Sequence, residues 1–365
     1  MKLKLAWCVI AFGLAVVATV LFAQPNRAVY LQRNLVSDLV GEANRRDPNL
    51  VNPWGISFNP MGGPFWVSDN GTGVVTVYNG AGKPFPVGSP IVVTVPPAAG
   101  GIPPSAPTGQ VFNPTVDFTL TPGMRAVFLF ATEDGTIAGW NPMVNATTAV
   151  TKVDNSGSGA IYKGLAMGSN VNGNFLFAAN FHAGTIDVFD KNFTPVISPG
   201  AFTDPNIPAG FAPFNIQNIG GQLYVTYAKQ DADKEDDVPG PGNGFIDVFD
   251  TSGVLVRRFA SQGTLNSPWG MAVAPSNFGE FSSTLLVGNF GDGRINAFNI
   301  STGAFLGQML TPTSEPLTIP GLWGLIFGNG GNGGSLDRLY FTAGIPGDGD
   351  LEDHGLFGEI RPQHP

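Results

Sequence analysis

The stretch Gly184-Thr-Ile-Asp-Val-Phe-Asp190 decides the fold, because the chain repeats its pattern. Each full copy has a glycine, a β-branched residue two positions later, an aromatic residue after three more, and a final Asn or Asp. The other copies are Gly73-Val-Val-Thr-Val-Tyr-Asn79, Gly135-Thr-Ile-Ala-Gly-Trp-Asn141, Gly244-Phe-Ile-Asp-Val-Phe-Asp250, Gly293-Arg-Ile-Asn-Ala-Phe-Asn299 and a degenerate sixth, Gly355-Leu-Phe-Gly-Glu-Ile360. The aromatic positions of the five full copies lie 62, 49, 60 and 49 residues apart. A period of about fifty residues with insertions indicates a repeat architecture.

Three other strand-like segments accompany each copy. One lies just before it, as in Phe175-Leu-Phe-Ala-Ala179, and another lies before that, as in Asn52-Pro-Trp-Gly-Ile-Ser-Phe58. In the second repeat we assign this earliest strand to Asn113-Pro-Thr-Val-Asp-Phe118, and a last strand follows the copy, as in Leu255-Val-Arg-Arg-Phe259. Aromatic and β-branched runs bounded by Gly, Asn and Asp are typical of strands. Six units of four strands predict an all-β protein, a six-bladed β-propeller.

The length of the chain is explained by one ring rather than by several domains. We expect a single propeller over residues 24–365, with the last blade completed by an N-terminal strand at residues 29–36. Glycine in the inner strands would let backbones crowd near the axis, where a side chain does not fit. The expected blades span residues 50–112, 113–161, 162–211, 212–266, 267–320 and 321–360.

Composition agrees with this class of fold. Of 365 residues, 50 are Gly and 31 are Pro, and charged residues make up 12%, against about 25% in typical domains. Long helices are therefore not expected. Hydrophobic residues make up 43% of the chain, which excludes a disordered polymer. A net charge of −9 repels phosphate backbones and excludes nucleic acid as a partner.

The amino terminus indicates export. Lys2 and Lys4 precede an apolar run at residues 5–23, which is typical of a secretory signal peptide over residues 1–23. The alternative is a retained membrane anchor, because the run is near the lower length limit for a spanning helix. Cys8 is the only cysteine, so the mature chain would have no disulfide or cysteine metal ligand. We expect a secreted or periplasmic protein of the bacterial envelope, monomeric and with no membrane span after cleavage.

The motifs resemble those of known propeller families. The Pro-Trp-Gly and Gly-x-Ile-x-Val-Phe-Asp patterns are similar to those of NHL and SMP-30-like six-bladed propellers. The segment Lys229-Gln-Asp-Ala-Asp-Lys-Glu-Asp-Asp-Val-Pro-Gly-Pro-Gly-Asn-Gly-Phe245 resembles a family of secreted bacterial propellers whose function is uncharacterised. The resemblance implies a fold and a compartment. The wider group contains lactonases, lyases and binding modules, so the fold alone does not choose a function.

We expect the candidate functional side chains to lie on one face of the ring. In this strand order, the entries into the first strands and the turns between second and third strands meet around one channel mouth. The ligand-face candidates there are Asp69, Asn70, Glu133, Asp134, Asn180, Asn289, Asp292, Trp54, Trp269 and Trp323. The tryptophans recur at matched positions, which favours packing between blades, and a stacking platform for a ligand is the alternative.

Two acidic insertions extend this face. Their carboxylates are Asp231, Asp233, Glu235, Asp236 and Asp237 in the fourth blade and Asp348, Asp350, Glu352 and Asp353 in the sixth. Carboxylates spaced along one loop suit Ca²⁺ or another divalent cation, although neither insertion has the central Gly and distal Glu of an EF-hand. The alternative is a solvated acidic loop that limits aggregation.

Candidate catalytic groups are few. His182 and His354 fall in turns of opposite blades, where each would act as a base or metal ligand or only bond its own turn. The sequence has no Gly-x-Ser-x-Gly elbow, phosphate loop, or nucleotide or flavin motif. We therefore predict a ligand-binding or interaction module for a small molecule, a glycan or a protein. The alternative is a metal-dependent hydrolase or lyase of the SMP-30-like kind, with His182 or Lys163 as the base.

Overall fold

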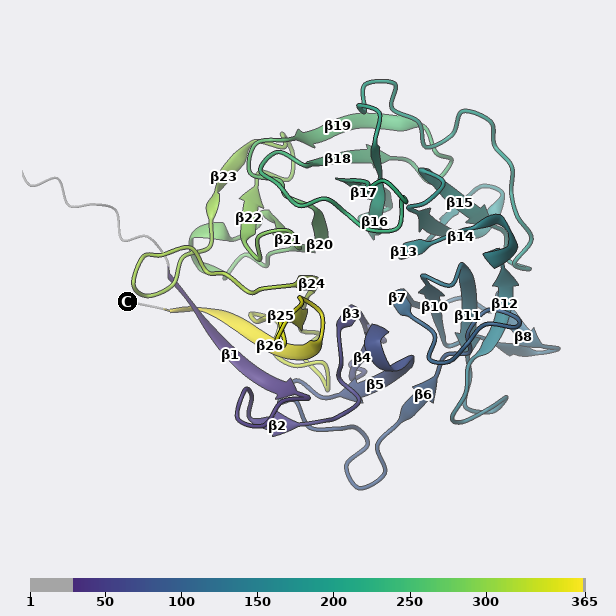
Figure 1. Cartoon of the computed structure of the whole chain (residues 1–365), viewed down its shortest axis with the longest axis horizontal. Helices are drawn as coiled ribbons and strands as arrows, with labels where there is room; N and C mark the ends of the chain where they lie inside the picture. The colour runs from purple at the N-terminus through teal and green to yellow at the C-terminus, as the bar shows by residue number, and fades with distance from the viewer. Residues whose placement is uncertain (1–28, 364–365) are drawn as a thin grey trace, which may run out of the picture.

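The computed structural model describes residues 29–363, and six small sheets stand in a ring around a central axis (Figure 1). This arrangement confirms the predicted six-bladed β-propeller. The predicted signal peptide lies outside the described residues. No helix among residues 29–363 has the length and apolar character needed to cross a membrane.

Blades one to three follow the order of the chain. Blade one contains β3 (Pro53–Ser57), β4 (Phe65–Asp69), β5 (Val74–Tyr78) and β6 (Val92–Thr94). Blade two contains β7 (Pro107–Phe112), β10 (Phe128–Thr132), β11 (Thr136–Trp140) and β12 (Val150–Asp154), with a small hairpin of β8 (Thr119–Thr121) and β9 (Met124–Arg125). Blade three contains β13 (Tyr162–Asn170), β14 (Gly173–Asn180) and β15 (Thr185–Phe189).

Blades four to six complete the ring. Blade four contains β16 (Phe211–Ile219), β17 (Gln222–Lys229), β18 (Gly244–Phe249) and β19 (Leu255–Ser261). Blade five contains β20 (Pro268–Val273), β21 (Leu285–Asn289), β22 (Ile295–Phe298) and β23 (Phe305–Gln308). Blade six contains β24 (Leu322–Phe327), β25 (Leu339–Ile345), β26 (His354–Gln363), β1 (Val29–Ser37) and the short parallel β2 (Arg45–Arg46).

The ring closes through the first described strand, as the sequence predicted. β1 pairs antiparallel with β26, from Val29 opposite Gln363 to Ser37 opposite Leu356. Leu35 is fully buried in an apolar cluster that also contains residues of blade one. The two ends of the described chain therefore belong to one sheet, and that sheet packs against the first blade (Figure 1).

Two details differ from the expected strand pattern. The first strand of blade two is β7, so this blade begins before residue 113; Asn113 instead makes a turn in which its Oδ1 accepts from the Thr115 backbone N–H at 2.9 Å. Blade three has three strands in place of four. The segment 191–210 that would supply the fourth strand contains four prolines, which cannot donate to a strand ladder.

Glycines in the inner strands let neighbouring blades touch. A methyl group at Gly55 would overlap the backbone oxygen of Thr108 in the next blade, and one at Gly270 would overlap that of Trp323. Gly109 lies equally close to the Leu165 backbone. This crowding around the axis is the reason that the repeat keeps glycine there.

Candidate functional site

One position of the inner strand stands next to the axis in every blade. It precedes the inner-strand glycine, or Asn215 where blade four replaces that glycine. The six matched positions are occupied by Trp54, Thr108, Lys163, Phe214, Trp269 and Trp323.

The aromatic members of this ring of positions pack together. Trp54 and Trp323 stack with ring centroids 3.6 Å apart, and Trp269 meets Trp323 edge-on at 5.7 Å. With Phe181, Phe214 and Phe290 they form one buried aromatic cluster, here called the aromatic plug. The plug lies at the Lys163 end of the channel, where the three tryptophans pack against one another.

Lys163 is the one charged residue of this ring of six positions. Its Nζ lies 2.8 Å from Oε1 of Glu133 and 3.1 Å from Oδ1 of Asp236, while its side chain is 2% exposed. The ammonium also lies 5.2 Å from the Trp54 ring centroid and 5.5 Å from that of Phe181, within cation–π range. Lys163 therefore covers the aromatic plug with a charge that is paired on its outer side.

The two carboxylates position this ammonium from different blades. Glu133 follows β10 in blade two, and Asp236 belongs to the loop after β17 in blade four. Burial lowers the pKa of Lys163, but the charges of Glu133 and Asp236 outweigh it and hold that pKa above its usual value. Lys163 remains protonated at neutral pH and is not a free base.

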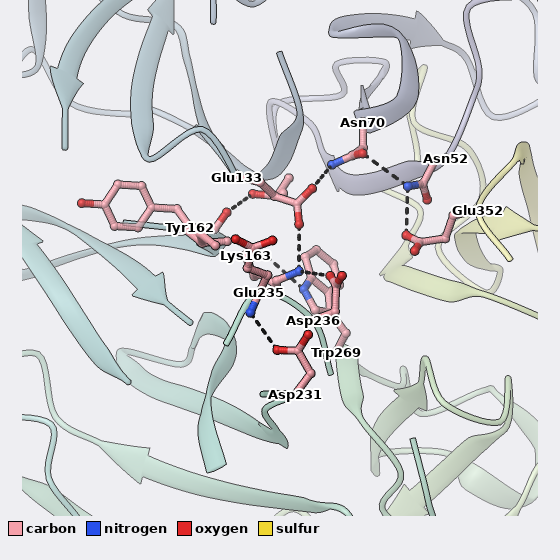
Figure 2. Close-up of polar contacts among 12 residues, drawn as sticks. Asn52, Asn70, Glu133, Tyr162, Lys163, Asp231, Glu235, Asp236, Trp269 and Glu352 are labelled. Carbon is pink, nitrogen blue, oxygen red and sulfur yellow. Dashed lines mark hydrogen bonds and ion pairs between the residues drawn. The ribbon is translucent and has the colours of Figure 1, made fainter. Parts of the chain in front are cut away.

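The network continues to the other side of the mouth. Glu133 Oε2 accepts from Asn70 Nδ2 at 2.9 Å, and Asn52 Nδ2 donates to Glu352 Oε1 at 2.9 Å (Figure 2). Asn52 Nδ2 also lies 3.3 Å from Asn70 Oδ1. Turns of blades one, two, four and six thus meet at one end of the channel, and we call the set Asn52, Asn70, Glu133, Lys163, Asp236 and Glu352 the acidic mouth.

Burial shifts the pKa of two carboxyl groups, Glu352 in the acidic mouth and Asp237 next to Asp236. It raises the pKa of Glu352 to about 7 and that of Asp237 to about 6. For both groups the charge of Lys163 acts in the opposite direction, while that of Asp236 adds to the rise. The negative charge of the mouth therefore increases as the pH rises through this range.

Several predicted ligand-face residues have structural partners instead. Asp69 is fully buried, its Oδ2 accepts from Thr76 Oγ1 at 2.7 Å, and burial raises its pKa well above the usual value. Asp134 Oδ2 accepts from the Ala106 backbone N–H at 3.0 Å. These carboxylates fix turns and strand ends, and they do not contact the network of the acidic mouth.

Asn180, Asn289 and Asp292 also have hydrogen-bond partners outside the acidic mouth. Asn180 Nδ2 donates to Asp187 Oδ2 at 3.0 Å, within blade three. Asn289 Nδ2 donates to Asp292 Oδ1 at 3.0 Å and to the Thr264 carbonyl at 2.8 Å. Each of these groups is therefore engaged in local contacts away from the mouth.

Neither candidate histidine joins the acidic mouth. His354 Nδ1 lies 2.7 Å from Asp38 Oδ2, at the seam between β26 and the segment after β1. His182 is half-buried, and its ring lies against Gly159 in the preceding turn. His354 therefore bonds across the seam of the ring and not within its own turn, and Nδ1 of His182 has no hydrogen-bond partner among residues 29–363.

The carboxylates of the two acidic insertions are spread apart among the described residues. Within residues 29–363, no group of three or more His, Cys, Asp or Glu side chains is arranged to hold an ion. Asp231 Oδ1 accepts from the Glu235 backbone N–H at 2.9 Å, and Asp353 Oδ2 from that of Asp350 at 3.3 Å. The side chains of Asp233 and Asp348 are exposed. Asp236 and Glu352 are the members of the two insertions that hydrogen-bond within the acidic mouth, and Asp237 is close enough for the charges of Lys163 and Asp236 to act on it.

The hydrogen bonds that link the residues of the acidic mouth were not predicted from the sequence. Asn52 links Glu352 to Asn70 and also accepts from Trp323 Nε1 at 3.1 Å, yet its place before Pro53 indicated only a strand start. A signal for the mouth does exist in the sequence. The Lys163-Gly164 pair aligns with Trp54-Gly55 and therefore indicates that the lysine stands at the axis.

Comparison with known proteins places the chain among viral relatives. It is 35% identical over 348 residues to "Uncharacterized protein R648" of Acanthamoeba polyphaga mimivirus, covering 92% of this chain and 82% of that protein. It is 36% identical to "Uncharacterized protein L690" of the same virus, covering 92% and 87%. The expected family of secreted bacterial propellers is therefore wrong, because the relatives that show the family are mimivirus proteins. No family model matches the chain.

Similar solved structures support the fold alone. A catalytically inactive virginiamycin B lyase from Staphylococcus aureus, solved with quinupristin, aligns with a TM-score of 0.51 at 15% identity and covers 92% of this chain and 99% of that one. A protein of unknown function from Bacteroides thetaiotaomicron aligns with a TM-score of 0.53 at 10% identity, covering 92% and 77%.

Proposed function

This chain belongs to the protein family of the two mimivirus relatives, and from that premise we propose that it is a ligand-binding module. Its acidic mouth would receive a positively charged group of the ligand. The proposal places the chain in the binding class rather than among enzymes. It rests on the chain's own residues, because the printed names of its relatives state no activity.

One observation carries the proposal: a single ammonium faces an excess of carboxylates. Glu133 and Asp236 bond Lys163 directly, and the charges of Asp237 and Glu352 act on the same group of side chains. The side chain of Asp236 is 76% exposed and that of Glu133 is 26% exposed, so both carboxylates are accessible from solvent. Negative groups that converge on a surface produce a negative potential that attracts cations.

The geometry gives less support to the alternative, a metal-dependent hydrolase or lyase. Its candidate base Lys163 is held protonated by two carboxylates, and His182 and His354 make contacts elsewhere. A general base must lie within hydrogen-bond reach of the proton that it removes. The lyase activity in the name of one similar structure belongs to that protein.

Calorimetry with a trilysine peptide, blocked at both ends, tests the proposal. We expect saturable binding that weakens as salt rises, because exposed charges are screened. Asp236→Asn should weaken binding at least fivefold. Glu315→Gln changes an exposed carboxylate outside the mouth and is the matched control, so it should leave the affinity unchanged. Equal affinities of the two variants would refute the proposal.

A divalent cation such as Ca²⁺ is a second candidate ligand for the acidic mouth. Asp236 and Glu352 carry carboxylate oxygens, the type of ligand that Ca²⁺ prefers, and water would complete the coordination because no third such group converges with them among the described residues. Elemental analysis of the purified protein, with thermal melts in the presence and absence of a chelator, tests this candidate. The absence of bound metal, together with an unchanged melting temperature, would rule it out.

A further inference from the structure

The other end of the channel contains a large cavity. Its volume is about 660 Å³, and its walls come from the inner strands of all six blades, β3, β7, β13, β16, β20 and β24. Each inner strand begins near the acidic mouth and runs away from it, so the cavity lies beyond the aromatic plug. Trp269 is the only member of the plug in the cavity wall, and no residue of the acidic mouth lines the cavity.

Among the described residues, none with an ionisable side chain lines this cavity. The wall combines aliphatic groups such as Leu165, Ile216 and Leu325 with the amides of Gln110, Gln217 and Asn218. A charged group placed there would lose its hydration without gaining a partner charge, which is costly. This end of the channel is therefore uncharged in the part of the chain that the structure describes, whereas the acidic mouth has an excess of carboxylates.

Two buried polar groups of the wall have unused hydrogen-bonding capacity. Gln110 Nε2 donates to the carbonyls of Gly55 and Trp66, both at 2.8 Å, but its Oε1 has no partner among the described residues. The Ser57 hydroxyl likewise has no partner within residues 29–363. Gln110 is 6% exposed. Buried polar atoms are nearly always bonded to protein, water or ligand.

Hydrogen bonds between two blades hold part of the cavity rim in place. Asn218 Nδ2 donates to the Met167 carbonyl at 2.9 Å, and Thr251 Oγ1 donates to the Ser169 carbonyl at 3.0 Å. These bonds join blades three and four. A ligand would therefore enter a preformed site, which reduces the entropy lost on binding.

We propose that this cavity is a second binding site, for an uncharged small molecule with an apolar body and hydrogen-bonding groups. The volume is within the range of about 300–1,000 Å³ that is typical of small-molecule pockets. The site is independent of the cation-binding function proposed for the acidic mouth, since the aromatic plug separates the two and their ligands differ in charge.

Fluorescence titration of the folded protein with Nile red, an uncharged dye, tests the proposal. We expect one saturable site with blue-shifted emission, and binding at least tenfold weaker for the anionic dye ANS. Gln217→Trp fills the cavity from a half-buried position and should weaken Nile red binding at least tenfold. Met143→Trp introduces the same side chain at an exposed position outside the cavity, so it is the matched control and should retain binding.

A second variant and a mouth variant make the test specific. If Gln217→Trp does not fold, Ser169→Trp blocks the rim from an exposed position and should have the same effect. Asp236→Asn should not change Nile red affinity, so failure of the mouth proposal leaves this one intact. The proposal is overturned if the folded Gln217→Trp and Ser169→Trp variants bind Nile red like the unmodified chain, or if ANS binds equally well.

Discussion

Lys163 Nζ lies 2.8 Å from Glu133 Oε1, and this contact joins the inner strand of blade three to a turn of blade two. The lysine stands where three other blades place a tryptophan, so the repeat has exchanged an aromatic ring for a cation at one position. The same ammonium reaches Asp236 in blade four at 3.1 Å. One side chain thus ties three blades together at the acidic mouth.

Replacing Lys163 by Met should destabilise the protein by about 2 kcal/mol at pH 7. Loss of one partner from a buried ion pair costs about 3–5 kcal/mol, and the cost is smaller here because Asp236 is largely solvated. Urea denaturation measures the difference. Lys191→Met, at an exposed position, is the matched control and should change stability by less than about 0.5 kcal/mol. Similar losses for both variants would contradict the role given to Lys163.

Glu352→Gln should make stability less dependent on pH. Burial raises the pKa of Glu352 from its ordinary 4.5 to about 7, so the folded state holds a proton that the unfolded state has released. Its stabilising contribution is complete below about pH 4.5 and is lost as the pH rises through about 7.

The glutamine variant removes this loss and should be more stable than the parent at pH 8, by on the order of 1–2 kcal/mol, since one unit of pKa shift corresponds to about 1.4 kcal/mol and partial solvation reduces the effect. The amide oxygen of the introduced glutamine can still accept from Asn52. Urea melts at pH 5 and pH 8 measure the change. An equal pH dependence of the two proteins would show that Glu352 ionises normally.

Gly55→Ala should lower stability by roughly 2 kcal/mol or more, because its methyl group would overlap the Thr108 backbone and force two blades apart. Gly157→Ala is the control, since a methyl group there meets nothing within 4 Å. Thermal unfolding of both variants provides the comparison. A tolerated alanine at Gly55 would mean that the inner strands are less crowded than the structure indicates.

Leu35→Ala tests the closure of the ring. Leu35 belongs to the closing strand β1 and is fully buried against residues of blade one. Its truncation to alanine should therefore lower the free energy of unfolding by about 2–5 kcal/mol. Val40→Ala, at an 82% exposed position just after the strand, should change stability by less than about 0.5 kcal/mol. If Leu35→Ala were equally mild, β1 would not be needed to close the ring.

Most of the fold could be predicted from local pattern. The Gly-x-Ile-x-Val-Phe-Asp copies give one strand per blade and a period, and residues 29–36 fit the strand missing from the last blade. The sequence pattern predicted the wrong first strand for blade two, because two neighbouring segments there both contain a proline typical of a strand start. Asn113-Pro114 imitates the strand start at Asn52-Pro53, but Pro107 occupies that position in blade two.

The site was only partly predictable, because its contacts cross between blades. Asn70, Glu133, Asp236 and Glu352 were expected on one face, and the structure brings them together. The sequence does not show that Lys163 would pair with two of them, since those partners are 30 and 73 residues away. The predicted metal ligands lie in the two acidic insertions. The spacing of carboxylates along a loop does not determine how many of them meet at one point in the folded protein.

The affinity of the acidic mouth for blocked trilysine at pH 5.5 and pH 8.0 tests the central claim most directly. The charge of the peptide is constant over this range, because lysine has a pKa of about 10.4, whereas Glu352 and Asp237 ionise between the two values. We predict about tenfold tighter binding at pH 8.0, and a smaller gain for Glu352→Gln. Absence of binding, or affinity that does not change with pH, would contradict the account.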